Sequence, residues 1–182
     1  MQVDLNNQVA FVCGSSSGIG RAIAALLAKN GADIVLNGRA EASAREVIDE
    51  IQRLGRKVIF EKADISEYHD MKRALDHALS EFGKIDILVN CQGYNVLKPI
   101  VQTTEEEWDA IVNTNLKSVY STCKAVFPHM LKQGGGHIFN VSSRAAMWYP
   151  GGGGIPIYKG SKMGLIGFSK ALADDGRKQN IK

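Results

Sequence analysis

The stretch "CGSSSGIGRAIAALLAKNG" (13–31) decides the fold, because it joins a short apolar run to a helix-patterned segment through a glycine-rich turn. The run before it, "QVAFVC" (8–13), is typical of a parallel strand that helices cover on both faces. In such a fold the first turn of the helix offers free N–H groups to a phosphate at the carboxyl ends of the strands. Gly14, Gly18 and Gly20 give the spacing GxxxGxG, which differs from GxGxxG and from the P-loop. We favour dinucleotide binding here over a merely tight connection.

The same alternation continues along the chain. Further apolar runs occupy 33–37, 57–60, 85–90 and 137–142. Helix-patterned stretches lie between or after them at 19–31, 41–55, 67–83, from Thr104 to about Gln133, and from about Ile157 to Arg177. Strands and helices in strict alternation predict an α/β fold, a doubly wound parallel sheet in a Rossmann-like, three-layer αβα arrangement. We expect a single domain over 1–182.

Composition and charge limit the classes of function. The 182 residues are 45% hydrophobic and 23% charged, which suits one soluble globular core. The 22 basic and 19 acidic residues are interspersed, and no basic block indicates nucleic acid or a membrane surface as a partner. Cys13, Cys91 and Cys123 form no CxxC pair, and the four histidines show no zinc-ligand spacing, so we expect no metal. Reduced thiols and the lack of an export signal favour a cytoplasmic protein.

The end of the second apolar run bears on the choice of cofactor. In "VLNGRAEAS" (35–43), Gly38 occupies the place where a carboxylate would accept ribose hydroxyls, and Arg39 follows. A cation without an opposing charge suits a 2′-phosphate, so we favour NADP(H) over NAD(H). The alternative is that Arg39 is a solvated loop arginine, and Glu41 places a negative charge nearby.

Tyr158 and Lys162 are four residues apart and therefore share one helical face. An ammonium beside a phenol favours the phenolate, which makes the tyrosine a candidate acid/base. Such a pair is common on ordinary helices, but "NVSS" (140–143) and "NCQG" (90–93) end two strands at the same crevice.

Five motifs in this order resemble the classical short-chain dehydrogenase/reductase family, in particular its 3-oxoacyl-carrier-protein reductase-like members, over nearly the whole chain. They are GxxxGIG at 14–20, the NNAG-like turn at 90–93, Asn115 in "NTNLKSV" (113–119), Ser143, and YxxxK at 158–162.

The resemblance implies a role for each catalytic position. Tyr158 would be the general acid/base, and Lys162 would hold the nicotinamide ribose and favour the phenolate. Ser143 would hydrogen-bond the substrate oxygen, with Ser142 as the alternative. Asn115 would hold a water that relays protons to Lys162.

The resemblance also implies a cofactor-binding set: Gly14, Ser16, Ser17, Gly18, Ile19, Gly20, Arg39, Asp64, Ile65, Asn90, Gly93, Tyr158 and Lys162. Substrate contacts would come from Ser143, Tyr158 and Tyr94. Residues that follow strand ends either line the site or pack as loop side chains: Tyr94, Asn95, Met147, Trp148 and Tyr149.

Three departures from the family pattern stand out. Cys13 replaces the usual threonine, the NNAG turn reads Asn-Cys-Gln-Gly, and the chain stops at Lys182 although members run to about 250 residues. We expect a chain without the C-terminal substrate-lid region, whose fifth strand becomes an exposed sheet edge. The glycines of 150–156 would either order on ligand binding or simply lengthen the loop.

The expected function is NADP(H)-dependent hydride transfer between the nicotinamide and a small-molecule carbonyl or secondary alcohol. The alternatives are an NAD-preferring sugar or polyol dehydrogenase, a nucleotide-binding module without turnover, and a chiefly structural subunit. The resemblance also implies a homo-oligomer, a dimer or a tetramer.

Overall fold

The computed structural model describes residues 3–147 and 154–182. Five parallel strands form one sheet in the order β3-β2-β1-β4-β5. Their bounds are β1 Val9–Cys13, β2 Asp33–Gly38, β3 Val58–Lys62, β4 Ile87–Asn90 and β5 His137–Asn140. The chain steps outward from β1 to β3, returns, and continues on the other side of β1. The predicted doubly wound α/β fold is therefore confirmed.

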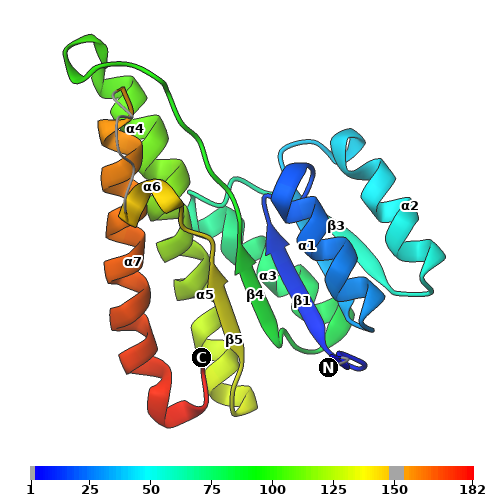
Figure 1. The fold of residues 1–182 in the computed structure, drawn as a ribbon. Coiled ribbons are helices and arrows are strands. Elements are labelled where there is room, and N and C mark those ends of the chain that lie inside the picture. The colour runs from blue at the N-terminus through cyan, green and yellow to red at the C-terminus, as the bar shows by residue number, and fades with distance from the viewer. Residues whose placement is uncertain (1–2, 148–153) are drawn as a thin grey trace.

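Helices cover both faces of this sheet. They are α1 Gly18–Lys29, α2 Arg45–Arg53, α3 Tyr68–Phe82, α4 Glu105–Val112, α5 Ser118–Gln133, α6 Arg144–Met147 and α7 Pro156–Gly176. Short 3-10 turns are η1 Glu41–Ala44, η2 Ile100–Gln102 and η4 Arg177–Gln179, and η3 Asn113–Lys117 is a π-helical turn. Figure 1 shows α1 and α2 together on one face of the sheet. Among the described residues, no helix is both long enough and apolar enough to cross a membrane.

Alternate strand residues pack into two separate cores, as the two-residue period of a strand requires. On one face Ile34 and Leu36 of β2 pack with α1 and α2. On the other face Phe11 and Leu88 pack with α3, α5 and the Leu165 side chain of α7. Each such side chain is fully buried or nearly so, and contributes about 1.5–3 kcal/mol to folding.

The helix predicted from Thr104 to about Gln133 is divided in the structure. A capping box between Thr104 and Glu107 begins α4, and the π-helical turn η3 then separates it from α5. Within this turn Asn115 is fully buried, and the hydroxyl of Ser118 donates to the Thr114 carbonyl oxygen at 2.6 Å. The wide turn thus places a polar amide inside the protein, which a regular hydrophobic pattern does not reveal.

Within the described residues β5 forms one edge of the sheet, and Phe139 on it is 53% exposed. Residues near the end of the chain cover the start of this edge. Ile181 pairs with Gly136 in a parallel bridge, and the backbone N–H of Ile138 donates to the Lys182 carbonyl oxygen at 2.8 Å. Among the described residues, no strand pairs with the rest of that edge.

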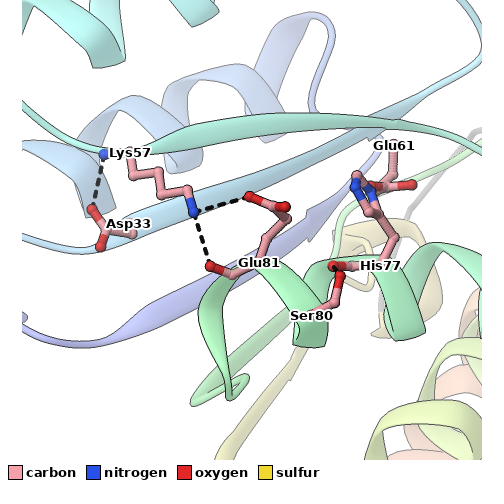
Figure 2. A network of polar contacts seen from close by, with 6 residues as sticks. All are labelled: Asp33, Lys57, Glu61, His77, Ser80 and Glu81. Carbon is pink, nitrogen blue, oxygen red and sulfur yellow. Dashed lines mark hydrogen bonds and ion pairs between the residues drawn. The ribbon is translucent and has the colours of Figure 1, made fainter.

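Polar contacts fix the opposite edge strand, β3, to its neighbours (Figure 2). The backbone N–H of Lys57 donates to Asp33 Oδ1 of β2 at 2.9 Å. The Lys57 ammonium donates to the carbonyl oxygen and the carboxylate of Glu81 on α3, at 2.8 and 3.0 Å. The buried carboxylate of Glu61 contacts the imidazole of His77, also on α3.

Candidate active site

A cavity of about 1030 Å³ lies at the carboxyl ends of the strands. Among its lining residues are most of the predicted cofactor set: Gly14, Ser16, Ser17, Gly18, Ile19, Gly20, Arg39, Asp64, Ile65, Gly93, Tyr158 and Lys162. Tyr94 and Asn95 line it as well. A smaller groove beside β5 and α7 contains none of the predicted site residues. The large cavity is therefore the candidate active site.

The glycine-rich turn forms one wall of this cavity, and its shape fits a dinucleotide. Gly14 and Gly18 have φ of 69° and 55°, in the left-handed region that favours glycine. A Cβ on Gly20 would lie 2.2 Å from the Gly14 carbonyl oxygen, so only glycine allows the helix to approach the turn. The side chain of Ser17 makes no capping hydrogen bond to α1. The first N–H groups of α1 thus stay available to a phosphate.

The second wall follows β2 and β3. Arg39 is exposed there, and no carboxylate among the described residues forms an ion pair with it, Glu41 included. A Cβ on Gly38 would lie 3.3 Å from Ser16 Oγ and 3.4 Å from the Phe60 ring, which leaves little room for an acidic side chain.

Asp64 also lies on this wall, directly after β3. Its Oδ1 accepts hydrogen bonds from the N–H and the hydroxyl of Ser66, at 2.9 and 2.7 Å. These bonds fix the carboxylate at the entrance to α3.

The predicted tyrosine and lysine come from the first turns of α7, and both line the cavity. Lys162 is only 3% exposed. Its ammonium donates to the carbonyl oxygens of Val141 at 2.9 Å and Gln92 at 3.4 Å, and to no carboxylate among the described residues. Burial lowers the pKa of Lys162, and the nearby Cys91 thiol opposes that shift. The structure therefore holds a buried cation without a carboxylate partner among the described residues, in the same cavity as Tyr158.

Asn115 does not line the cavity, but its side chain bonds to Tyr94, which does. Its Oδ1 accepts from the Tyr94 N–H at 2.8 Å, and its Nδ2 donates to the Tyr94 carbonyl oxygen at 2.9 Å and to Ser161 Oγ at 3.0 Å. The amide thus clamps the segment after β4 against α7. Both Nδ2 protons are used by protein groups, Oδ1 accepts one hydrogen bond, and the water relay stays a prediction.

The two serines after β5 occupy different environments. Ser142 lines the cavity, and its hydroxyl donates to the Lys162 carbonyl oxygen at 3.0 Å. Ser143 Oγ accepts from the Ala145 N–H at 3.1 Å near the start of α6, and donates to no group among the described residues. The hydroxyl proton of Ser143 is therefore the one left for a substrate oxygen, although Ser142 lies nearer the cavity.

Asn90 is the other predicted residue that lies beneath the cavity. It is buried, donates to Asn140 Oδ1 at 2.8 Å, and accepts from the Thr122 hydroxyl at 2.8 Å. Its role in this structure is to join β4, β5 and α5.

Met147 is 79% exposed and does not line the cavity, while Trp148 and Tyr149 lie outside the described residues. The glycine segment 150–156 is described only from Gly154 onward, where the Gly154 carbonyl oxygen accepts from the Lys98 N–H at 2.7 Å.

Six lining residues were not predicted: Asn37, Ala63, Ser66, Ala110, Thr114 and Ser118. Cys91, Gln92, Val141 and Ser142 also line the cavity and belong to the two strand ends predicted to lie there. Asn37 lies near a strand end, and that position is a signal that could have found it. Thr114 and Ser118 reach the cavity because of the turn η3, for which the sequence holds no such signal.

The departure at Cys13 leaves a backbone bond to the start of the next turn in place. Cys13 is fully buried in the core, and its carbonyl oxygen accepts from the Cys91 N–H at 3.3 Å. The glycine-rich turn and β4 are therefore joined through the backbone. Within the described part of the chain, no group of His, Cys, Asp and Glu side chains is arranged to hold a metal ion.

Comparison with known proteins shows which family this chain belongs to. The sequence profile of the short chain dehydrogenase family matches residues 8–182. A 3-oxoacyl-[acyl-carrier-protein] reductase FabG from Chlamydia pneumoniae is 36% identical over 182 residues, which cover all of this chain and 73% of that protein. A hydroxynaphthalene reductase-like protein, Arp2, from Metarhizium robertsii is 38% identical over 181 residues, covering 97% of this chain and 66% of that protein.

A solved structure shows the same architecture. A 7α-hydroxysteroid dehydrogenase complexed with NADH and 7-oxo glycochenodeoxycholic acid superimposes with a TM-score of 0.93 at 30% identity, covering all of this chain and 70% of that one. The chain belongs to the short-chain dehydrogenase family. It is an oxidoreductase of that type, which interconverts CH–OH and C=O groups with a nicotinamide cofactor.

Proposed function

We propose that this protein is an NADP(H)-preferring reductase of small-molecule carbonyl compounds, with Tyr158 as the acid/base. The observation that supports it best is the buried, carboxylate-free ammonium of Lys162 in the same cavity as Tyr158 and the uncapped start of α1. A bound nicotinamide supplies or accepts the hydride, and the protein provides orientation and the proton.

In the direction of reduction, Tyr158 gives its phenolic proton to the carbonyl oxygen of the substrate. The Lys162 ammonium stabilises the phenolate that remains, because opposite charges attract strongly in a poorly hydrated site. Ser143, or Ser142 in its place, donates a hydrogen bond to the substrate oxygen as negative charge develops there. Asn115 acts on this step indirectly, through the segment at Tyr94 and through Ser161.

The preference for NADP(H) rests on Arg39. Its guanidinium is exposed at the cavity and unpaired among the described residues, and guanidinium groups suit bidentate contacts with phosphate. The alternative of an NAD-preferring enzyme has its own support, because the hydroxysteroid dehydrogenase of the same fold was solved with NADH.

The relatives point to a carbonyl substrate but differ in its nature. One is named for a 3-oxoacyl group on acyl carrier protein, one for a hydroxynaphthalene, and one for a steroid. We propose a small-molecule ketone or secondary alcohol and assign no narrower class.

We also propose a homo-oligomer and a cytoplasmic location. Exposed Trp108 on α4 and Met163 on α7, 52% and 59% exposed, support helix-to-helix association. The three cysteines are free thiols, as is usual in a reducing compartment.

The test is a fluorescence titration with NADPH and NADH, followed by a screen of ketones with the preferred cofactor. We expect tighter binding of NADPH and turnover of at least one ketone. Tight dinucleotide binding without turnover across the whole panel would instead favour a nucleotide-binding module, and binding of neither dinucleotide would refute both.

A further inference from the structure

Asn37, near the end of β2, lies between the glycine-rich turn and the end of β3. It is 2% exposed and lines the cavity. Its neighbours are the turn after β1 and the end of β3, which pairs with β2 in parallel register.

The backbone of Asn37 is bound to the glycine-rich turn through Ser15. The Ser15 N–H and hydroxyl both donate to the Asn37 carbonyl oxygen, at 3.1 and 3.3 Å, and the Asn37 N–H donates to Ser15 Oγ at 2.9 Å. Ser15 is itself fully buried. Any displacement of Asn37 therefore moves the turn that forms the phosphate side of the cavity.

The side chain of Asn37 reaches in the other direction. Its Nδ2 donates to the carbonyl oxygens of Glu61 and Ala63, at 3.0 and 3.2 Å. Both amide protons are thus used on β3 and the residue just after it. Asp64 and Ile65 follow immediately and line the cavity.

The end of β3 is also fixed from outside. The Glu61 carboxylate, whose side chain is 6% exposed, contacts the imidazole of His77 on α3 (Figure 2). This contact fixes β3 to α3, whereas Asn37 sets the position of β3 relative to β2 and the glycine-rich turn.

We propose that Asn37 is a positioning residue for the adenosine half of the dinucleotide, an inference that rests on the proposed function. It acts through the carbonyls of Glu61 and Ala63 and through Ser15, and so sets the distance between the phosphate-binding turn and the Asp64–Ile65 wall. Alanine would remove this side-chain donor from both carbonyl oxygens, and the loss of buried hydrogen bonds costs stability.

The test compares three variants. N37A removes both donated bonds, N37T keeps one hydroxyl donor on a residue type that suits strands, and N30A is the matched control. Asn30 makes the same kind of bond, from Nδ2 to the Leu26 carbonyl oxygen at 2.8 Å, but at the exposed end of α1. Each variant is titrated with 2′,5′-ADP for the adenosine side, with nicotinamide mononucleotide for the other side, and with NADPH.

We expect N37A to weaken 2′,5′-ADP and NADPH binding by the same factor of about ten, since 1.4 kcal/mol corresponds to tenfold. Binding of the mononucleotide should stay unchanged, N37T should recover part of the loss, and N30A should behave as wild type in all three titrations. Undiminished binding of 2′,5′-ADP by N37A, or an equal loss for the mononucleotide, would overturn the proposal.

Amide hydrogen exchange of the free protein separates this inference from the proposed function. N37A, or N37T if N37A does not fold, should exchange faster at residues 61–65 than wild type, while exchange in α7 stays the same. Unchanged exchange at 61–65 would refute the positioning role whatever the protein binds. If the wild type bound no dinucleotide, the proposed function would be refuted, and the exchange result would still decide the role of Asn37 in the fold.

Discussion

The ammonium of Lys162 lies 2.9 Å from the carbonyl oxygen of Val141, so a charged group of α7 is held against the end of β5. This contact is buried and lacks a carboxylate. A buried cation usually costs stability. We therefore infer that Lys162 is buried here for its function and not for folding.

Replacing Lys162 with methionine should therefore stabilise the fold while abolishing turnover. The pKa of Lys162 is lowered from its ordinary 10.5, so the unfolded chain binds more protons between the lowered value and 10.5. Stability of the wild type should rise with pH across that window, and the advantage of K162M should shrink. Thermal midpoints of both proteins from pH 7 to 10 check this; an advantage that grows with pH would contradict it.

Replacing Tyr158 with phenylalanine should lower kcat by a factor of about 10² to 10⁴, the usual contribution of a general acid. NADPH binding should change little, since the ring remains. Steady-state kinetics together with cofactor titration make the distinction. Y120F is the control, because Tyr120 lies on the exposed side of α5 and its hydroxyl bonds only Lys124 among the described residues. Retained turnover in Y158F would exclude the assigned role.

Replacing Arg39 with alanine should weaken NADPH binding by about tenfold or more while leaving NADH binding within about twofold, because a charge-assisted bond to a phosphate is lost. Arg45 is exposed at the start of α2 and does not line the cavity, so R45A provides the matched control. Equal weakening of both cofactors would show that Arg39 does not read the 2′-phosphate.

Cys91 should be the first of the three thiols to react with iodoacetamide. Cys13 and Cys123 are buried, and burial raises the pKa of Cys123 to about 12 and that of Cys13 further. Burial also raises the pKa of Cys91, so its alkylation should be slow at pH 7 and accelerate above pH 9, since the thiolate is the nucleophile. Because Cys91 lines the cavity, bound NADPH should slow the reaction. Peptide mass spectrometry locates the adduct, and the absence of protection would place the cofactor elsewhere.

Replacing His77 with leucine should destabilise the protein by about 2 kcal/mol, because it leaves the Glu61 carboxylate buried without its partner. The double variant E61L/H77L should recover most of this loss, since two apolar side chains replace the pair. Denaturant unfolding of the single and double variants measures the difference. A double variant no more stable than H77L would show that the unpaired Glu61 carboxylate is not the cause of the lost stability.

Much of the fold was predictable because its signals are local. Apolar runs separated by helical patterns predicted a doubly wound parallel sheet. The glycines after α3 and α5 have φ of 78° and 89°, in the left-handed conformation common at helix ends. The break between α4 and α5 was not predictable, because the amide of Asn115 is satisfied by Tyr94 and Ser161, which are distant in sequence.

The candidate site was predictable for residues that belong to recognisable motifs. It was less predictable where contacts between distant parts of the chain determine the position of a side chain. Tyr158 and Lys162 line the cavity as expected from their spacing. Asn90 and Asn115 instead support it from beneath, because their side chains are used by neighbouring elements. The contacts of Asn37 could not be predicted, because its side chain donates to backbone carbonyl oxygens of Glu61 and Ala63. Every residue type has such a carbonyl, so the sequence carries no signal for the contact.

The π-helical turn Asn113–Lys117 has a consequence for insertions and deletions. Such a turn contains one residue more than an α-helical path would use, and each helical residue turns the chain by about 100°. Loss of a single residue here would rotate α5 about its axis relative to α4 and turn Asn115 away from Tyr94. The length of this segment therefore matters to the geometry of the candidate site as much as the identity of its residues does.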